Sequence, residues 1–344
     1  MSLGFDSVTL RATMATPSAP FPQSVPRIEA APAEFSVVIP VFNEEHTLPL
    51  LLQRVTAVLD GLGAPYELLF VDDGSRDRTL EVLREAQTHR PEIRVVELSR
   101  NFGKEIAVSA GLDHTSGRAV VVMDADLQDP PELIPELLEK WREGYDAVYA
   151  TRRVRHGESW LKRSTASLFY YLLSKTSDVP IPRETGDFRV LDRSVVETLR
   201  RLPEHNRFMK GLFAWVGFRQ TAVYFDRPAR AQGSSKWNLA GLWRLSVDGF
   251  TSFSSLPLKI AGYVGMLVSL VAFAYSIFLV VRTIVFGVDV PGYASLMVVI
   301  LFLGGLQLFT LGVVGEYLGR VFIEVKRRPL YVVRRLHGFG EGEQ

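Results

Sequence analysis

The chain has 344 residues, enough for one large domain or two with a full hydrophobic core. It has no cysteine, so disulfides, thiolate metal sites and cysteine nucleophiles are excluded. The formal net charge is +1, yet residues 151–260 hold 19 Lys and Arg against 9 Asp and Glu. This basic middle segment is typical of binding to phosphates or to an anionic lipid surface, although an ordinary solvated basic face is the alternative.

Residues 1–33 are rich in Ala, Pro and Ser and show no sustained apolar period, so they are expected to be a disordered extension. Beyond them, short β-branched runs alternate with longer stretches of helical periodicity. Such alternation predicts an α/β fold with a mostly parallel sheet and flanking helices. The predicted strands are Phe35–Phe42, Tyr66–Asp73, Ile93–Ser99, Ala119–Asp126 and Asp146–Arg152.

Polar residues stand at the end of each predicted strand. They are Asn43 with Glu44, Asp72 to Ser75, Arg100 with Asn101, Asp124 with Asp126, and Arg152. In open α/β sheets, ligands bind beyond the carboxyl ends of the strands, so these residues predict one site. Asp124 and Asp126 offer hard oxygen ligands to a divalent cation that a diphosphate-bearing substrate would share, although loop acids or helix caps are the alternative.

Two amphipathic stretches follow, Trp160–Ser174 and Asn238–Phe253. Core-facing helices would fit each of them, but their position before long apolar runs favours helices lying in a membrane interface. Ile260–Val281 then contains 22 residues without a charge, and Val290–Gly315 contains 26. Each run is long enough to cross roughly 30 Å of hydrocarbon as a helix.

The short connection between these runs predicts a transmembrane hairpin with both ends on one side. Lys259 and a basic cluster over residues 326–335 flank those ends, which predicts that the α/β domain and both termini are cytoplasmic. The expected organisation is an α/β domain over 34–237 and an interfacial helix over 238–258. Two transmembrane helices at about 260–282 and 291–315, and a basic tail over 319–344, complete it.

Three motifs at the strand ends are PVFNEE at Pro40–Glu45, VDDGSRDRT at Val71–Thr79 and DADLQDPP at Asp124–Pro131. Together they resemble the inverting glycosyltransferase family 2, which has the Rossmann-like GT-A fold. TGDFRVLDR at Thr185–Arg193, RAQGSSKW at Arg230–Trp237 and the paired spans are similar to polyprenyl-phosphate glycosyltransferases. That subgroup includes bactoprenol glucosyltransferases and, more distantly, dolichol-phosphate mannose synthases.

The resemblance implies transfer of a hexose, with inversion, from a nucleotide diphosphate to a polyprenyl phosphate such as undecaprenyl phosphate. The residues around Asp187 and the stretch 207–220 resemble glucosyl-type members, which favours UDP-glucose. Mannose, galactose, an N-acetylhexosamine or an aminoarabinose-type sugar stay open. The family also implies a homo-oligomer, with a tetramer as the expected form, located at the plasma membrane. No nucleic-acid partner is expected.

The resemblance also implies roles for individual residues. Asp126 and Gln128, with Asp124 close to the metal or the ribose, are expected to hold Mg²⁺ or Mn²⁺. Asp187 is expected to orient the acceptor or to act as a weak base, and Arg163 and Ser167 to hold the acceptor phosphate. The residues expected to bind the base, ribose and phosphates of the donor are Pro40, Phe42, Glu44, Asp72, Asp73, Arg152, Arg230 and Lys236.

Three other classes of protein compete with this interpretation. A processive polysaccharide synthase would carry Gln-x-x-Arg-Trp and more spans than the two found here. A non-catalytic membrane scaffold is disfavoured because Asp124, Asp126, Gln128 and Asp187 are all present. A soluble dinucleotide-dependent dehydrogenase is excluded because no Gly-x-Gly-x-x-Gly follows the first predicted strand.

Overall fold

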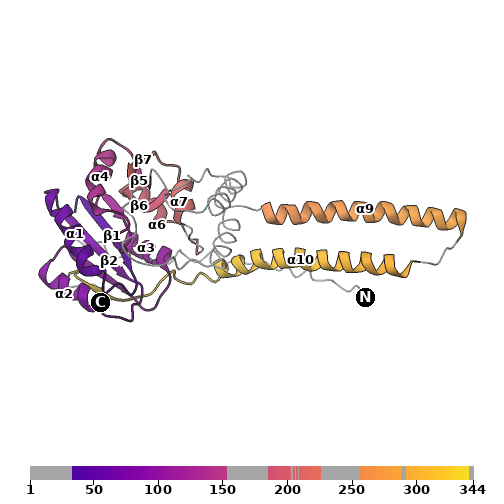
Figure 1. Ribbon diagram of the computed structural model, residues 1–344, viewed down its shortest axis with the longest axis horizontal. Coiled ribbons are helices and arrows are strands. Elements are labelled where there is room, and N and C mark those ends of the chain that lie inside the picture. The colour runs from indigo at the N-terminus through magenta and orange to yellow at the C-terminus, as the bar shows by residue number, and fades with distance from the viewer. Residues whose placement is uncertain are drawn as a thin grey trace, which may run out of the picture.

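The computed structural model describes residues 33–152, 185–202, 204–205, 207, 209–225, 256–287 and 292–340. Within these residues the chain forms an α/β domain from which a long helical hairpin projects (Figure 1). Residues 1–32 and the two predicted interfacial helices up to residue 253 lie outside the described part of the chain. Ala33, the last residue of the predicted extension, is buried at the start of the domain.

The five predicted strands are confirmed, and helices separate them. The elements are β1 (Phe35–Val41), α1 (Leu48–Gly61), β2 (Tyr66–Asp72), α2 (Thr79–His89), β3 (Ile93–Leu98), α3 (Lys104–Asp113), β4 (Ala119–Val122), η1 (Pro131–Leu133), α4 (Ile134–Arg142) and β5 (Ala147–Arg152). β4 ends at Val122 rather than at the predicted Asp126. The two aspartates therefore belong to the loop after the strand, because the pairing of β4 with β1 and with β6 stops at Val122.

Three further strands were not among the predicted ones. The later elements are β6 (Thr185–Asp192), α6 (Arg193–Arg200), α7 (Met209–Trp215), β7 (Gln220–Phe225), α9 (Leu256–Phe286), α10 (Tyr293–Val325) and β8 (Val333–His337). β8 lies within the segment that was expected to be a basic tail. The C-terminal segment is therefore part of the α/β domain.

The eight strands form one sheet in the order β7-β5-β6-β4-β1-β2-β3-β8. Parallel ladders join β1 to β2 and β4, β2 to β3, and β5 to β7, which confirms the mostly parallel sheet. β6 is antiparallel to β4 and β5, and β8 is antiparallel to β3. Because β6 pairs Arg189 with Val122, its first residues lie at the edge where β4 ends. This reversal brings Asp187 to the loop that carries Asp124.

Helices cover both faces of the sheet and bury an apolar core on each side. Leu51 and Val55 of α1, Leu83 of α2 and Leu137 of α4 pack on one face. The other face is covered by α3, α6 and α7 through buried side chains such as Val108, Val195 and Leu212. Burial of such side chains contributes roughly 1.5–3 kcal/mol each, so both layers fix the strand ends that carry the polar residues.

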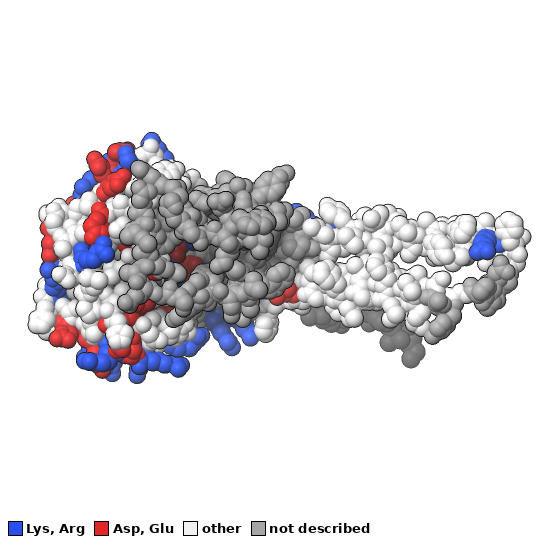
Figure 2. Space-filling view, viewed as in Figure 1, with Lys and Arg blue, Asp and Glu red and all other residues white. Residues whose placement is uncertain are grey.

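The hairpin of α9 and α10 is apolar over most of its length, and its two helices run side by side. Within Leu258–Phe286 and within Ser295–Val325, an 18-residue stretch has a mean hydropathy of 2.5 and 2.4 respectively, and both helices are long enough to cross a membrane. Figure 2 shows charged side chains gathered on the α/β domain and an almost uncharged hairpin surface. The chain thus carries a candidate transmembrane hairpin whose helices extend beyond the predicted spans.

The segment after α10 is attached to the α/β domain at several points. His205 donates its backbone N–H to Glu324 near the end of α10, over 2.9 Å. Tyr331 donates its hydroxyl to Asp113 at the end of α3, over 2.9 Å. β8 then pairs with β3, and Phe339 is buried against the sheet's second core. The candidate membrane hairpin is therefore connected to the sheet by a bound strand.

Candidate active site

One lysine contacts two of the predicted site residues. The Lys104 ammonium lies 2.7 Å from Asp124 Oδ1 and 2.8 Å from Asp124 Oδ2. The same ammonium forms a close ion pair with Asp187 Oδ2. Lys104 is the first residue of α3, Asp124 follows β4 and Asp187 lies in β6. The sheet edge therefore brings together three residues that are far apart in the sequence.

A second lysine reaches the same carboxylate from another helix. Lys210 of α7 places its ammonium 3.4 Å from Asp187 Oδ1. Burial alone would raise the pKa of Asp187, but Lys210 and Lys104 outweigh it and hold the pKa well below its ordinary value. Burial dominates at neighbouring Glu105 and raises the pKa of its carboxyl to about 7. Asp187 is consequently held as a carboxylate between two cations.

The position of Lys104 is fixed by the loop that precedes α3. Asp73, at the end of β2, accepts the backbone N–H of Phe102 at 2.7 Å and of Gly103 at 2.9 Å. Gly103 has a φ of 99°, a conformation that only glycine adopts without strain. The Asp73 carboxylate thus holds the loop after β3 against the loop after β2. This contact directs the start of α3 toward Asp124.

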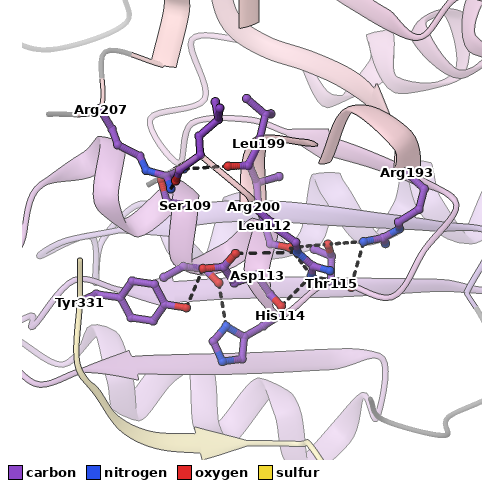
Figure 3. Close-up of polar contacts among 12 residues, drawn as sticks. Ser109, Leu112, Asp113, His114, Thr115, Arg193, Leu199, Arg200, Arg207 and Tyr331 are labelled. Atoms are coloured by element: carbon purple, nitrogen blue, oxygen red, sulfur yellow. Dashed lines mark hydrogen bonds and ion pairs between the residues drawn. The ribbon is translucent and has the colours of Figure 1, made fainter. Parts of the chain in front are cut away.

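The other end of α3 is held by arginines of α6 and by the C-terminal segment (Figure 3). Arg200 donates to the carbonyls of Leu112 and Asp113, each at 2.6 Å through Nη2. Tyr331 donates to the Asp113 carboxylate from the opposite side. The Arg200 donors satisfy carbonyls that a helix end leaves unpaired, and the guanidinium also complements the helix dipole. α3 is therefore anchored at both ends.

Hydrogen bonds join the loops after β1 and β2. Asn43 receives the Arg76 backbone N–H on its side-chain oxygen at 2.8 Å and donates its own backbone N–H to Ser75 Oγ at 3.0 Å. Glu44 donates its backbone N–H to Thr79 Oγ1 at 2.8 Å. Asp72, which is buried, accepts the Ser75 backbone N–H at 3.2 Å. These contacts preorganise the two loops before any ligand binds.

The loop after β4 presents oxygen donors of the kind that Mg²⁺ and Mn²⁺ prefer. Asp126 is exposed and accepts the Gln128 backbone N–H at 3.0 Å. Leu127 between them has a positive φ of 55°, uncommon for a residue other than glycine. Within the described ranges, no group of three or more His, Asp or Glu could hold a metal ion. Asp124, Asp126 and Gln128 fit a cation that takes its other ligands from a substrate.

Comparison with known proteins agrees with this geometry. The family model described as glycosyl transferase family 2 matches residues 36–200, and the GtrB C-terminal hairpin model matches residues 256–321. An uncharacterized glycosyltransferase of Synechocystis sp. is 58% identical over 305 residues, covering 89% of this chain and 96% of the relative. The chain belongs to glycosyl transferase family 2. This glycosyltransferase thus has the GT-A-like fold expected from its motifs.

A second relative has a more specific description. The protein described as bactoprenol glucosyl transferase of Shigella phage SfII is 45% identical over 304 residues, covering 88% of this chain and 98% of the relative. Solved structures are more distant. Glucosyl-3-phosphoglycerate synthase from Mycobacterium tuberculosis, in complex with Mn²⁺, UDP-glucose and phosphoglyceric acid, has 22% identity and a TM-score of 0.42. The match covers 64% of this chain and 78% of the synthase chain. A likeness this distant does not show which metal or substrate this chain binds.

The remaining predicted residues of the glycosyltransferase fall into two groups. Pro40 is the last residue but one of β1, and Phe42 directly follows the strand, where it is 41% exposed and free to contact a ligand. Arg152 is the last residue of β5. The residues of the second group lie outside the described part of the chain: Arg163, Ser167, Arg230 and Lys236.

Three residues around Asp187 were not among those predicted from the sequence: Lys104, Lys210 and Glu105. The sequence could have pointed to Lys104, because a cation in the first turn of a helix is unfavourable beside the helix dipole and therefore suggests a functional role. Lys210 carried no comparable signal. It reaches Asp187 only because α7 packs on the same face of the sheet as α3. In this glycosyltransferase the predicted Asp73 also has both carboxylate oxygens engaged by backbone N–H groups, so it organises a loop.

Proposed function

We propose that this glycosyltransferase moves a hexose from a nucleotide diphosphate to a polyprenyl phosphate at the cytoplasmic face of the plasma membrane, with inversion. UDP-glucose is the proposed donor and undecaprenyl phosphate the proposed acceptor. The relative described as bactoprenol glucosyl transferase supports this choice through its 45% identity and 98% coverage. Release of the nucleoside diphosphate completes the reaction.

The observation that carries the proposal is the contact of Lys104 with both Asp124 and Asp187. Asp124 belongs to the loop proposed to hold the donor diphosphate, and Asp187 to the strand proposed to meet the acceptor. A single ammonium spans both, so the two reacting groups would meet within the reach of one side chain. Such proximity is what a direct transfer between donor and acceptor requires.

The donor half of the site would hold the nucleotide and its diphosphate. Asp126, Gln128 and Asp124 would bind Mg²⁺ or Mn²⁺, which would stabilise the negative charge that develops on the leaving diphosphate. Phe42 offers an exposed ring to the base, and Asp72 is placed by Ser75 at the end of β2. Arg152, Arg230 and Lys236 are proposed to bind the phosphates, for which guanidinium and ammonium groups are suited.

The acceptor half needs little base catalysis. A phosphate monoester with a second pKa of about 6 is largely dianionic at neutral pH. Asp187, whose pKa the two lysines hold below its ordinary value, is a poor proton acceptor. Its proposed role is therefore to orient the acceptor phosphate through the cations around it. Arg163 and Ser167 are proposed to hold that phosphate at the membrane surface.

The candidate membrane hairpin would place this site beside the lipid. Lys326, Arg327 and Arg328 follow α10 directly, and basic residues flanking a span favour the cytoplasmic side. The tail they begin returns to the sheet through β8, so the α/β domain would lie on the same side. We also propose that the chain assembles as a homo-oligomer, with a tetramer as the expected form.

Membranes containing the chain should transfer labelled glucose from UDP-glucose to undecaprenyl phosphate when Mg²⁺ or Mn²⁺ is supplied. Parallel reactions with UDP-galactose, GDP-mannose, UDP-N-acetylglucosamine and an aminoarabinose donor would test the sugar. Labelled lipid from another donor alone would replace glucose in the proposal. No labelled lipid from any donor, with a folded protein in the membrane, would overturn it.

A further inference from the structure

The Lys104 ammonium occupies the carboxylate atoms that a cation in the donor site would need. It contacts both Asp124 oxygens, at 2.7 and 2.8 Å, and one oxygen of Asp187. An ammonium has three N–H donors and no acceptor, so these contacts use its full capacity. A divalent cation that approaches Asp124 therefore meets a positive charge that is already in place.

Within the described residues, the loop after β4 offers such a cation few other ligands. Asp126 and the side-chain amide of Gln128 are the neighbouring oxygen donors in the loop, and Asp126 Oδ1 also accepts the Gln128 backbone N–H. The part of the chain that the structure describes has no cluster of three or more His, Asp or Glu that could hold a metal ion. Magnesium-like ions complete their coordination with water and substrate phosphates. A free cation thus competes poorly with Lys104, whereas one carrying a diphosphate brings ligands with it.

Lys104 has the freedom to release Asp124. Its side chain is 41% exposed, and the Asp124 side chain is 27% exposed, so a ligand can reach both. A lysine carries its charge on a flexible four-carbon stem and can exchange a carboxylate for a phosphate nearby. Lys210 keeps its own contact with Asp187 at 3.4 Å. Asp187 would therefore keep a cationic partner when Lys104 moves.

We propose that Lys104 is the internal counter-ion of the donor site. It keeps a free divalent cation from binding Asp124 tightly. It releases the Asp124 carboxylate when the cation arrives with the nucleotide diphosphate. The inference rests on the proposed function for the identity of the donor. Lys104 is thus a positioning residue that makes cation and nucleotide bind as a pair. The cation would leave with the nucleoside diphosphate, because Lys104 returns to Asp124.

The test measures Mn²⁺ binding to the purified full chain by electron paramagnetic resonance, with and without UDP. The wild type should bind Mn²⁺ weakly alone and far more tightly with UDP. Lys104→Met should bind Mn²⁺ alone about tenfold more tightly. Its Mn²⁺ affinity with UDP should stay at the wild-type value, because Lys104 has then already released Asp124, so the gain from UDP should shrink by the same factor. Lys104→Arg retains a cation and should keep the wild-type pattern.

Lys210→Met is the matched control, because Lys210 contacts Asp187 but has no described contact with Asp124. It should change Mn²⁺ affinity much less than Lys104→Met does. An equal rise in both variants would mean that only net charge matters and would overturn the inference. An unchanged or weaker Mn²⁺ affinity in Lys104→Met would overturn it as well.

Thermal unfolding and UDP binding of each variant establish that it is folded. Lys104→Gln, which keeps a polar side chain of similar reach, replaces Lys104→Met if the latter does not fold. The sugar-transfer assay on the wild type is independent of these measurements. Absence of transfer with the Mn²⁺ and UDP pattern intact would refute the proposed function alone. Transfer with no effect of Lys104 on Mn²⁺ would refute this inference alone.

Discussion

Two carboxylate clusters lie at opposite ends of the strands, which are called here the amino edge and the carboxyl edge of the sheet. One cluster uses charge for structure and the other for function. At the amino edge, Glu67 accepts from Ser36 Oγ and from the Ser116 backbone N–H and forms an ion pair with Arg94. The side chains of Glu67 and Arg94 are only 3% and 12% exposed. At the carboxyl edge, Asp124 and Lys104 are 27% and 41% exposed.

The same chemical groups thus serve two purposes. Every oxygen of Glu67 is bound to a donor of the protein in a dry environment, so exchange with a ligand is blocked. Around Asp124, one lysine is shared between two carboxylates and solvent reaches the group. A cluster that is saturated and buried makes the fold sensitive to the loss of either partner, whereas one that shares its donors can accept a substrate.

The largest expected effect is on stability at the amino edge. Glu67→Ala should lower the free energy of unfolding by about 3–5 kcal/mol, because it leaves Arg94 largely buried without its partner. The apparent melting temperature in detergent would measure this. Glu132→Ala removes the exposed ion pair with Arg54 and should cost less than about 1 kcal/mol. Equal effects of the two substitutions would refute the contrast between a buried and an exposed carboxylate.

The next effect is on catalysis at the carboxyl edge. Asp126→Ala should lower kcat/KM for sugar transfer at least about 100-fold, since it removes a proposed metal ligand. The side chain is exposed, so the melting temperature should stay at the wild-type value. Transfer assays at saturating Mn²⁺ provide the measurement. Wild-type transfer by this variant would exclude Asp126 from the metal site.

An intermediate effect is expected for a carboxylate that is buried but lies close to the proposed donor site. Asp73 is buried like Glu67, yet it organises the loop that positions Lys104. Asp73→Ala should weaken UDP binding about tenfold, because two charge-assisted hydrogen bonds to the loop are lost. Titration calorimetry with UDP would measure the change. Unchanged affinity would show that the loop keeps its conformation without Asp73.

The smallest effect is expected at the far end of α3. Tyr331→Phe removes the hydrogen bond to Asp113 and should cost about 0.5–1.5 kcal/mol of stability. Sugar transfer should stay at the wild-type level, because α3 keeps its contacts with Arg200. Parallel melting and transfer measurements test both statements. A large loss of transfer would mean that the C-terminal segment acts on the site itself.

Local sequence was sufficient for much of the fold. The five strands β1 to β5 were predicted because β-branched runs and helical periodicity are properties of neighbouring residues. The apolar hairpin was predicted from length and lack of charge alone. Asp124 and Asp126 were recognised because they follow an apolar run directly.

The sequence could not show which distant segments pair. β6 lies antiparallel between β4 and β5. β8 pairs with β3 although the hairpin of α9 and α10 separates the two strands in the sequence. Strand pairing of this kind depends on the packing of the complete sheet, and no local period encodes it.

Short stretches of the chain encode the strand-end motifs, the mostly parallel sheet and the candidate membrane hairpin, so each could be predicted from neighbouring residues. Only the tertiary structure placed Asp187 beside Asp124 and brought Lys104 and Lys210 to them. Which cation pairs with a carboxylate depends on the distance between them and on their exposure to solvent, and the packing of the sheet and helices determines both.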